Sequence, residues 1–137
     1  MVDSKLEADT RVIAIGIHPR ALDYSTMPDG VDEASLTARI ESGAAALREA
    51  GFDVVRCEVD TAPDAAEEQV RTELGRAQFG LALVGGGIRM IPEHTELFER
   101  IVNVLHEVSP GIRLCFNTAP DNTVDALRRW IAPPVKG

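Results

Sequence analysis

The sequence predicts an α/β protein of three layers, in which helices cover both faces of a four-stranded parallel sheet. Short strand-like apolar runs alternate four times with segments of helical periodicity. The runs are continuously apolar, which is typical of strands that are buried on both faces. No shift in composition along the 137 residues marks a second domain, and this length suits a single domain. We therefore expect one α/β domain over residues 1–137.

Each element follows from a local pattern. The first strand, Arg11–Ile17, reads RVIAIGI and is an unbroken apolar run. The other strands lie between turn-forming residues and are expected at Phe52–Val59, Phe79–Val84 and Ile112–Asn117. The helices carry apolar residues three or four positions apart and are expected at Asp32–Ala50, Pro63–Ala77, Pro92–Val108 and Asp121–Ile131. Residues 1–10 and 132–137 are expected to be flexible tails.

Two features predict helix ends. Gly51 follows the first helix, at the place where a glycine commonly ends a helix. The tetrapeptide Thr-Ala-Pro-Asp occurs at 61–64 and again at 118–121, each time after an expected strand. The spacing is that of a capping box, in which the threonine side chain caps the helix and the aspartate side chain accepts a hydrogen bond from the backbone N–H of the threonine. We therefore expect Thr61 and Thr118 to cap the second and fourth helices.

The alternation of strands and helices limits the topology. Crossovers between parallel strands are almost always right-handed, and we expect the flavodoxin-like strand order 2-1-3-4. In such sheets, ligands bind beyond the carboxyl ends of the strands, where the strand order reverses. The segments that follow Ile17, Val84 and Asn117 are therefore the candidates for a functional site.

Charge and cysteine content narrow the possible partners. The chain has 14 Lys and Arg against 22 Asp and Glu, a net charge of −8 at pH 7. This balance argues against nucleic acid and anionic membrane as partners, because both attract basic patches.

Cys57 and Cys115 lie in apolar runs and are expected to be buried free thiols. Together with the polar start of the chain and the absence of a long apolar segment, they predict a cytoplasmic protein.

The segment after the first strand is a candidate catalytic loop. It spans residues 18–31 and is longer than the usual connection in such folds. His18, at the strand end, is suited to act as a general acid or base, and Asp23 and Tyr24 to orient a substrate. The structural alternatives are a histidine bonded within its loop, and a local Asx turn at Asp23 with the Tyr24 ring as a lid over the core.

The segments after the third and fourth strands are candidates for ligand binding. Gly85, Gly86 and Gly87 expose backbone N–H groups at the expected edge, and Arg89 could clamp a carboxylate or phosphate. A tight turn that needs glycine only for close packing is the alternative. Asn117 could offer its amide to the same ligand, and Thr118 could contribute to the site or cap the helix.

Familiar cofactor and catalytic motifs are missing. The chain has no Gly-x-Gly-x-x-Gly after the first strand, no phosphate-binding loop ending in Gly-Lys-Ser/Thr, and no Gly-x-Ser-x-Gly. No metal-ligand spacing occurs, and we expect neither a cofactor nor a metal. The response-regulator receiver fold shares the expected architecture. That family needs an acidic pair after the first strand and an aspartate after the third, where this chain has His18 and Gly85–Gly87.

One resemblance spans nearly the whole chain. It rests on five short segments: His18-Pro19, Asp23-Tyr24-Ser25, Gly85-x-Gly87-x-Arg89, Leu97-Phe98-Glu99 and Cys115-Phe116-Asn117-Thr118. In these the chain resembles a family of small bacterial single-domain α/β proteins of uncharacterised function. The resemblance implies a cytosolic, self-contained domain and no particular activity.

These observations lead to one main hypothesis and two alternatives. The main hypothesis is a cofactor-independent enzyme that binds a small anionic metabolite at the carboxyl edge of the sheet and uses His18 as acid or base. The basic residues His18, Arg20 and Arg89 at that edge favour an anion, although the whole chain is acidic. The first alternative is a ligand-binding or regulatory module without chemistry. The second is a dimeric scaffold that pairs through the wide apolar stripe of the third helix.

Overall fold

The computed structural model describes residues 5–133 and has the expected alternation of strands and helices. The strands are β1 (Arg11–Ile17), β2 (Asp53–Val59), β3 (Leu81–Val84) and β4 (Arg113–Phe116). The α-helices are α1 (Glu33–Glu49), α2 (Pro63–Leu74), α3 (Gly86–Arg89), α4 (Thr95–Val108) and α5 (Thr123–Arg128). Short 3-10 turns are η1 (Pro19–Ala21), η2 (Tyr24–Thr26), η3 (Pro92–His94) and η4 (Pro120–Asn122).

The sheet has the predicted topology. Its strands are all parallel and follow the order β2-β1-β3-β4. β1 is central and pairs with β2 over its whole length, from Arg11 opposite Asp53 to Ile17 opposite Val59. β3 pairs with β1 on one side and β4 on the other. The strand order therefore reverses between β1 and β3, and the carboxyl ends of these two strands meet at the expected edge.

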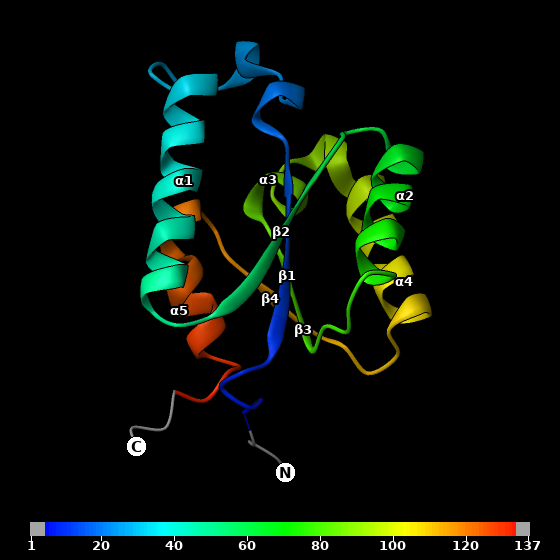
Figure 1. Ribbon diagram of the computed structural model, residues 1–137. Helices are drawn as coiled ribbons and strands as arrows, with labels where there is room; N and C mark the ends of the chain where they lie inside the picture. Colours follow the sequence, from blue (N-terminus) through cyan, green and yellow to red (C-terminus); the bar gives the residue numbers. More distant parts are fainter. Residues whose placement is uncertain (1–4, 134–137) are drawn as a thin grey trace.

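Helices cover both faces of the sheet, and the strand side chains beneath them differ in size. α2 and α4 pack on one face and α1 and α5 on the other, as Figure 1 shows. Because strand side chains alternate between faces, β1 directs Ile13, Ile15 and Ile17 toward α2 and α4. Its intervening residues, Val12 and Ala14, belong to the cluster beneath α1 and α5. The two faces of β1 thus differ in side-chain size.

One predicted helix end is confirmed by the structure, and two predicted helix caps are wrong. Gly51 follows α1 and adopts a φ of 87°, as a terminating glycine does. The expected threonine caps of the second and fourth helices are wrong. The N-cap position of α2 is Ala62, which has no side-chain acceptor, and its own N–H donates to the Asp60 carboxylate at 3.1 Å. Asn122 Oδ1 instead accepts from the backbone N–H of Thr118.

The connection from β3 to α4 differs from the expected single helix over 92–108. A short helix, α3, directly follows β3, and η3 comes before α4. The apolar stripe of α4 is largely buried in the core through Leu97, Ile101, Val104 and Leu105. Phe98 and Val102 of the same stripe are half-buried and Val108 is exposed, so the dimeric scaffold stays a prediction.

Parts of both expected tails pair with each other. Leu6 forms an isolated parallel bridge with Ile131, and its carbonyl accepts from the Ala132 N–H at 2.8 Å. Lys5 Nζ donates to the carbonyl of Arg128 at 2.8 Å. The remaining expected tail residues, 1–4 and 134–137, lie outside the described part of the chain.

The structure describes both cysteine thiols and the lengths of the helices. Cys57 and Cys115 are free and buried, as predicted. Burial raises the pKa of each thiol to about 12, so both are protonated at neutral pH. Over residues 5–133, none of the helices combines the length and the apolar character that crossing a membrane requires.

Candidate functional site

A pocket of about 190 Å³ lies between α1 and the sheet, at the point where the strand order reverses. We call it the α1 pocket. Its wall comes from the carboxyl half of β1, the turn after β3, the loop after β4 and the inner face of α1. The sequence predicts a site at this edge of the sheet, and the structure places a hollow there.

The pocket is hollow because its floor is built from very small side chains. β1 contributes Ala14 and Gly16, and α1 contributes Gly43 and Ala44. A Cβ added to Gly16 would meet no atom within 4 Å. The sequence carries a signal for this feature, since every second residue of β1 shrinks from Val12 through Ala14 to Gly16. Reading β1 only as an unbroken apolar run misses this decrease in side-chain size.

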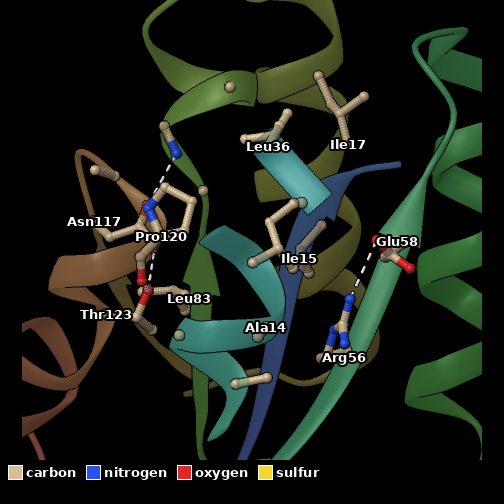
Figure 2. A pocket seen from close by; sticks show the side chains of 18 of the residues that line it. Ala14, Ile15, Ile17, Leu36, Arg56, Glu58, Leu83, Asn117, Pro120 and Thr123 are labelled. Atoms are coloured by element: carbon tan, nitrogen blue, oxygen red, sulfur yellow. Dashed lines mark hydrogen bonds and ion pairs between the residues drawn. The ribbon is translucent and has the colours of Figure 1, made fainter. Parts of the chain in front are cut away.

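Asn117 organises the wall on the β4 side of the pocket. Its side chain is 8% exposed, and its Oδ1 accepts from the Gly86 N–H at 3.0 Å. Its Nδ2 donates to Thr123 Oγ1 at 2.8 Å, and that hydroxyl donates to the carbonyl of Pro120 at 2.8 Å. These bonds, two of which Figure 2 marks, join the turn after β3 to the loop after β4. Asn117 therefore lines the pocket mainly as a structural tie between two loops.

Two of the three glycines after β3, Gly85 and Gly86, serve close packing, whereas a Cβ at Gly87 would meet no atom within 4 Å. The Gly85 N–H donates to the carbonyl of Ile15 at 2.9 Å, and a Cβ at Gly85 would lie 3.3 Å from that oxygen. A Cβ at Gly86 would lie 3.1 Å from the carbonyl of Thr118. The φ of Gly85 is −70°, so left-handed geometry is not the reason for this glycine. With the Gly86 N–H also bonded to Asn117, two of the three expected anion donors are engaged inside the protein.

Thr118 and part of the Arg89 guanidinium are bonded within the protein as well, although Arg89 Nε is buried without a partner among the described residues. Arg89 Nη2 donates to the carbonyl of Asn117 at 3.1 Å, and the guanidinium lies 5.3 Å from the centre of the Phe116 ring. Arg89 does not line the α1 pocket. Thr118 does line it, and its hydroxyl accepts from Asn122 Nδ2 at 2.6 Å. An arginine clamp on a ligand in this pocket therefore has no support in the geometry.

The expected catalytic loop is bonded to itself. His18 Nδ1 accepts from the backbone N–H of Arg20 at 3.1 Å, and the Tyr24 hydroxyl donates to the carbonyl of Pro19 at 2.6 Å. Asp23 accepts from both the N–H and the hydroxyl of Ser25, and these bonds lower the pKa of its carboxyl group. Burial raises the pKa of the Tyr24 phenol. His18, Asp23 and Tyr24 do not line the α1 pocket, so the structure does not bring this trio to the cavity.

Three charged residues near the β2 side of the pocket were not among the predicted site residues. Arg56 and Glu58 of β2 line the wall, across from Asn117, as Figure 2 shows. Arg56 Nη1 donates to Glu41 of α1 at 3.1 Å, and its Nη2 lies 3.5 Å from Glu58. A signal for them exists in the sequence, because Arg56 and Glu58 are charges two positions apart in the carboxyl half of a strand, and such residues point to the same face of the sheet.

Metal ligands do not gather at this site. Within residues 5–133, no group of three or more histidine, cysteine, aspartate or glutamate side chains is placed to hold a metal ion. The polar groups that line the pocket are an amide, two hydroxyls, a guanidinium and one carboxylate, besides backbone. Such a set suits the binding of a small organic molecule.

Comparison with known proteins yields a remote likeness. No family model matches the chain, and no curated protein matches it. Among solved structures, the chain is similar to the response regulator PhyR from Brucella abortus, with 14% sequence identity and a TM-score of 0.43. The match covers 93% of this chain and 42% of that chain, so this chain spans less than half of PhyR. At this level of similarity, neither an activity nor a partner transfers.

Proposed function

We propose that this chain is a binding module that takes a small molecule into the α1 pocket without transforming it. The observation that carries the proposal is the hollow itself, at the switch point of a parallel sheet and floored by Ala14, Gly16, Gly43 and Ala44. Protein interiors are close-packed, with few voids larger than a water molecule. A cavity of about 190 Å³ at the edge where α/β proteins bind ligands fits a binding site better than a packing defect.

The choice of binding over catalysis follows from the groups that line the pocket. Of the described residues, no histidine, cysteine or serine lines it, and its ionisable members, Arg56 and Glu58, face each other. General acid–base catalysis needs a titrating group within hydrogen-bond reach of the substrate. The expected role of His18 as acid or base, and the expected anionic metabolite, stay predictions, as do a homodimer and a cytoplasmic location.

A fragment screen with a pocket-filling variant tests the proposal. Small uncharged and charged fragments would be added to ¹⁵N-labelled protein, and amide shifts would be followed at Gly16 and Gly85. Ala44→Leu fills the pocket from α1, and Ala46→Leu is its matched control on the same helix, since Ala46 does not line the pocket.

We expect at least one fragment to shift the amides of Gly16 and Gly85 in the wild type and in Ala46→Leu, and to lose this effect in Ala44→Leu. Thermal melting of each variant confirms that it is folded. If no fragment binds, or if binding survives in a folded Ala44→Leu protein, the pocket is not a ligand site and the proposal is overturned.

A further inference from the structure

Building on the ligand-binding role proposed above, we infer that the α1 pocket selects a small amphipathic cation. Its apolar body, about the size of one aromatic ring, would lie between α1 and the sheet. Its amino or amidino group would meet the carboxylate of Glu58. Three features of the pocket carry this inference: the apolar lining, the unfilled bonding capacity of Glu58, and the charge balance around Arg56.

The lining and the volume define the apolar body. Leu36, Ile40 and Leu47 of α1 and Leu83 of β3 line the cavity together with Leu22, and the small residues Ala14, Gly16, Gly43 and Ala44 leave it open. In another protein, an engineered apolar cavity of about 150 Å³ holds one benzene molecule. At about 190 Å³, the α1 pocket has room for one ring and a short arm.

Glu58 lacks hydrogen-bond donors. Its side chain is only 33% exposed, and it contacts Arg56 Nη2 in an ion pair at 3.5 Å, which is longer than a good hydrogen bond. Within residues 5–133, no hydrogen bond to its carboxylate is formed. A carboxylate that is partly shielded from water and lacks a hydrogen-bond donor gains from a charged donor. An ammonium or amidinium group on the ligand would supply that donor.

The charges at this wall favour a cation over an anion. Two carboxylates, Glu41 and Glu58, surround the single guanidinium of Arg56, so the local charge is −1. Arg56 is already hydrogen-bonded to Glu41. An entering anion would have to displace that bond and approach Glu58. The net charge of −8 over the whole chain also attracts cations.

Three matched probes test the inference: 2-phenylethylamine, 2-phenylethanol and phenylacetate, each of which joins a phenyl ring to a short polar arm. Each would be titrated into ¹⁵N-labelled protein, with the dissociation constant taken from the amide shifts of Gly16 and Gly85. We expect the amine to bind about tenfold more tightly than the alcohol, the gain typical of one charge-assisted hydrogen bond. Phenylacetate should bind most weakly.

Two variants identify the source of the preference. Glu58→Gln should bring the amine to the affinity of the alcohol, while the alcohol itself binds as before. Glu99→Gln is the matched control, because Glu99 is exposed on α4, on the other face of the sheet. It should keep the wild-type preference.

The outcomes separate this inference from the proposed function. If the alcohol or phenylacetate binds as tightly as the amine, or if the preference for the amine survives in Glu58→Gln, the cation inference is overturned and the pocket remains a ligand site. If none of the three probes shifts the two amides, the inference is likewise overturned. The fragment screen with Ala44→Leu then decides independently whether the pocket binds ligands at all.

Discussion

The two faces of the sheet are built from the same strands and differ in how they are filled. On the face covered by α2 and α4, β1 presents Ile13 and Ile15, and α4 adds Leu97 and Ile101. These side chains are at most 1% exposed. On the face covered by α1 and α5, the same strand tapers to Gly16, and the α1 pocket lies beside a second, smaller core cluster. One face is therefore packed along the length of β1, whereas the other combines a packed cluster with the cavity that we propose as a binding site.

The helices reinforce the same contrast. α2 and α4 are joined across their outer surface by Glu67, which accepts from Arg71 at 3.0 Å and from Arg100 at 2.9 Å. Arg71 also binds Glu107 of α4 at 2.7 Å. α1 is tied to the loop after β4 by one exposed ion pair, Arg39 with Asp121, at 2.8 Å. The packed face is thus the more strongly cross-linked, and the face with the pocket is the less constrained.

The largest expected effect compares one large side chain from each face. Ile101→Ala should lower the free energy of unfolding by about 3 kcal/mol, because it leaves a cavity in a close-packed region. Ile40→Ala should lower it by only about 1 kcal/mol, since Ile40 is half-buried beside an existing hollow. Urea unfolding of both variants measures the difference. Equal losses would mean that the two faces are equally well packed.

The second prediction concerns the contact that holds α1 over the pocket. A Cβ at Gly43 would lie 2.7 Å from the backbone oxygen of Pro120, so Gly43→Ala must push α1 away from η4. The strain of about 2 kcal/mol should exceed the gain of about 1 kcal/mol in helix propensity. We expect a net loss of stability in thermal and urea unfolding. A variant more stable than the wild type would show that α1 moves freely, which would contradict a defined pocket.

The third prediction uses pH to test the cross-linked face. Hydrogen bonds from Arg100 and Arg71 hold the pKa of Glu67 below its usual value of 4.5. A carboxyl group whose pKa is lowered by folding stabilises the protein above the unfolded pKa and loses that contribution as pH falls through the folded pKa. The drop in unfolding free energy from pH 6 to pH 3 should therefore be smaller in Glu67→Gln than in the wild type. Glu99→Gln, the exposed control, should keep the wild-type drop.

The smallest expected effect has the opposite sign. Gly16→Ala adds a methyl group in open space at the pocket floor and should raise the free energy of unfolding by about 0.5 kcal/mol, chiefly by restricting the unfolded chain. The same substitution should weaken the binding of any fragment that reaches Gly16. Unchanged fragment affinity in a folded Gly16→Ala protein would show that the ligand does not reach the floor of the pocket.

Much of the fold could be predicted because it depends on local pattern. The apolar runs located all four strands, and Gly51 marked the end of α1. The capping residues were predicted less well. The repeated Thr-Ala-Pro-Asp has the spacing of a capping box. In those loops, however, the side chains of Asp60 and Asn122 accept hydrogen bonds from the backbone N–H groups of Ala62 and Thr118. A short motif cannot show which of several nearby acceptors reaches an N–H group first.

The sequence by itself determined the order of elements, the parallel sheet and the edge at which a site should lie, because hydrophobic periodicity and the handedness of crossovers are properties of the chain. Only the tertiary structure decided which polar groups remain available there. It brought Asn117 to Gly86 and Arg89 Nη2 to the carbonyl of Asn117, which engages some of the groups that looked free for an anion. It also set Glu58 beside the hollow with too few donors. Hydrogen bonds between distant segments depend on distances that no linear pattern encodes.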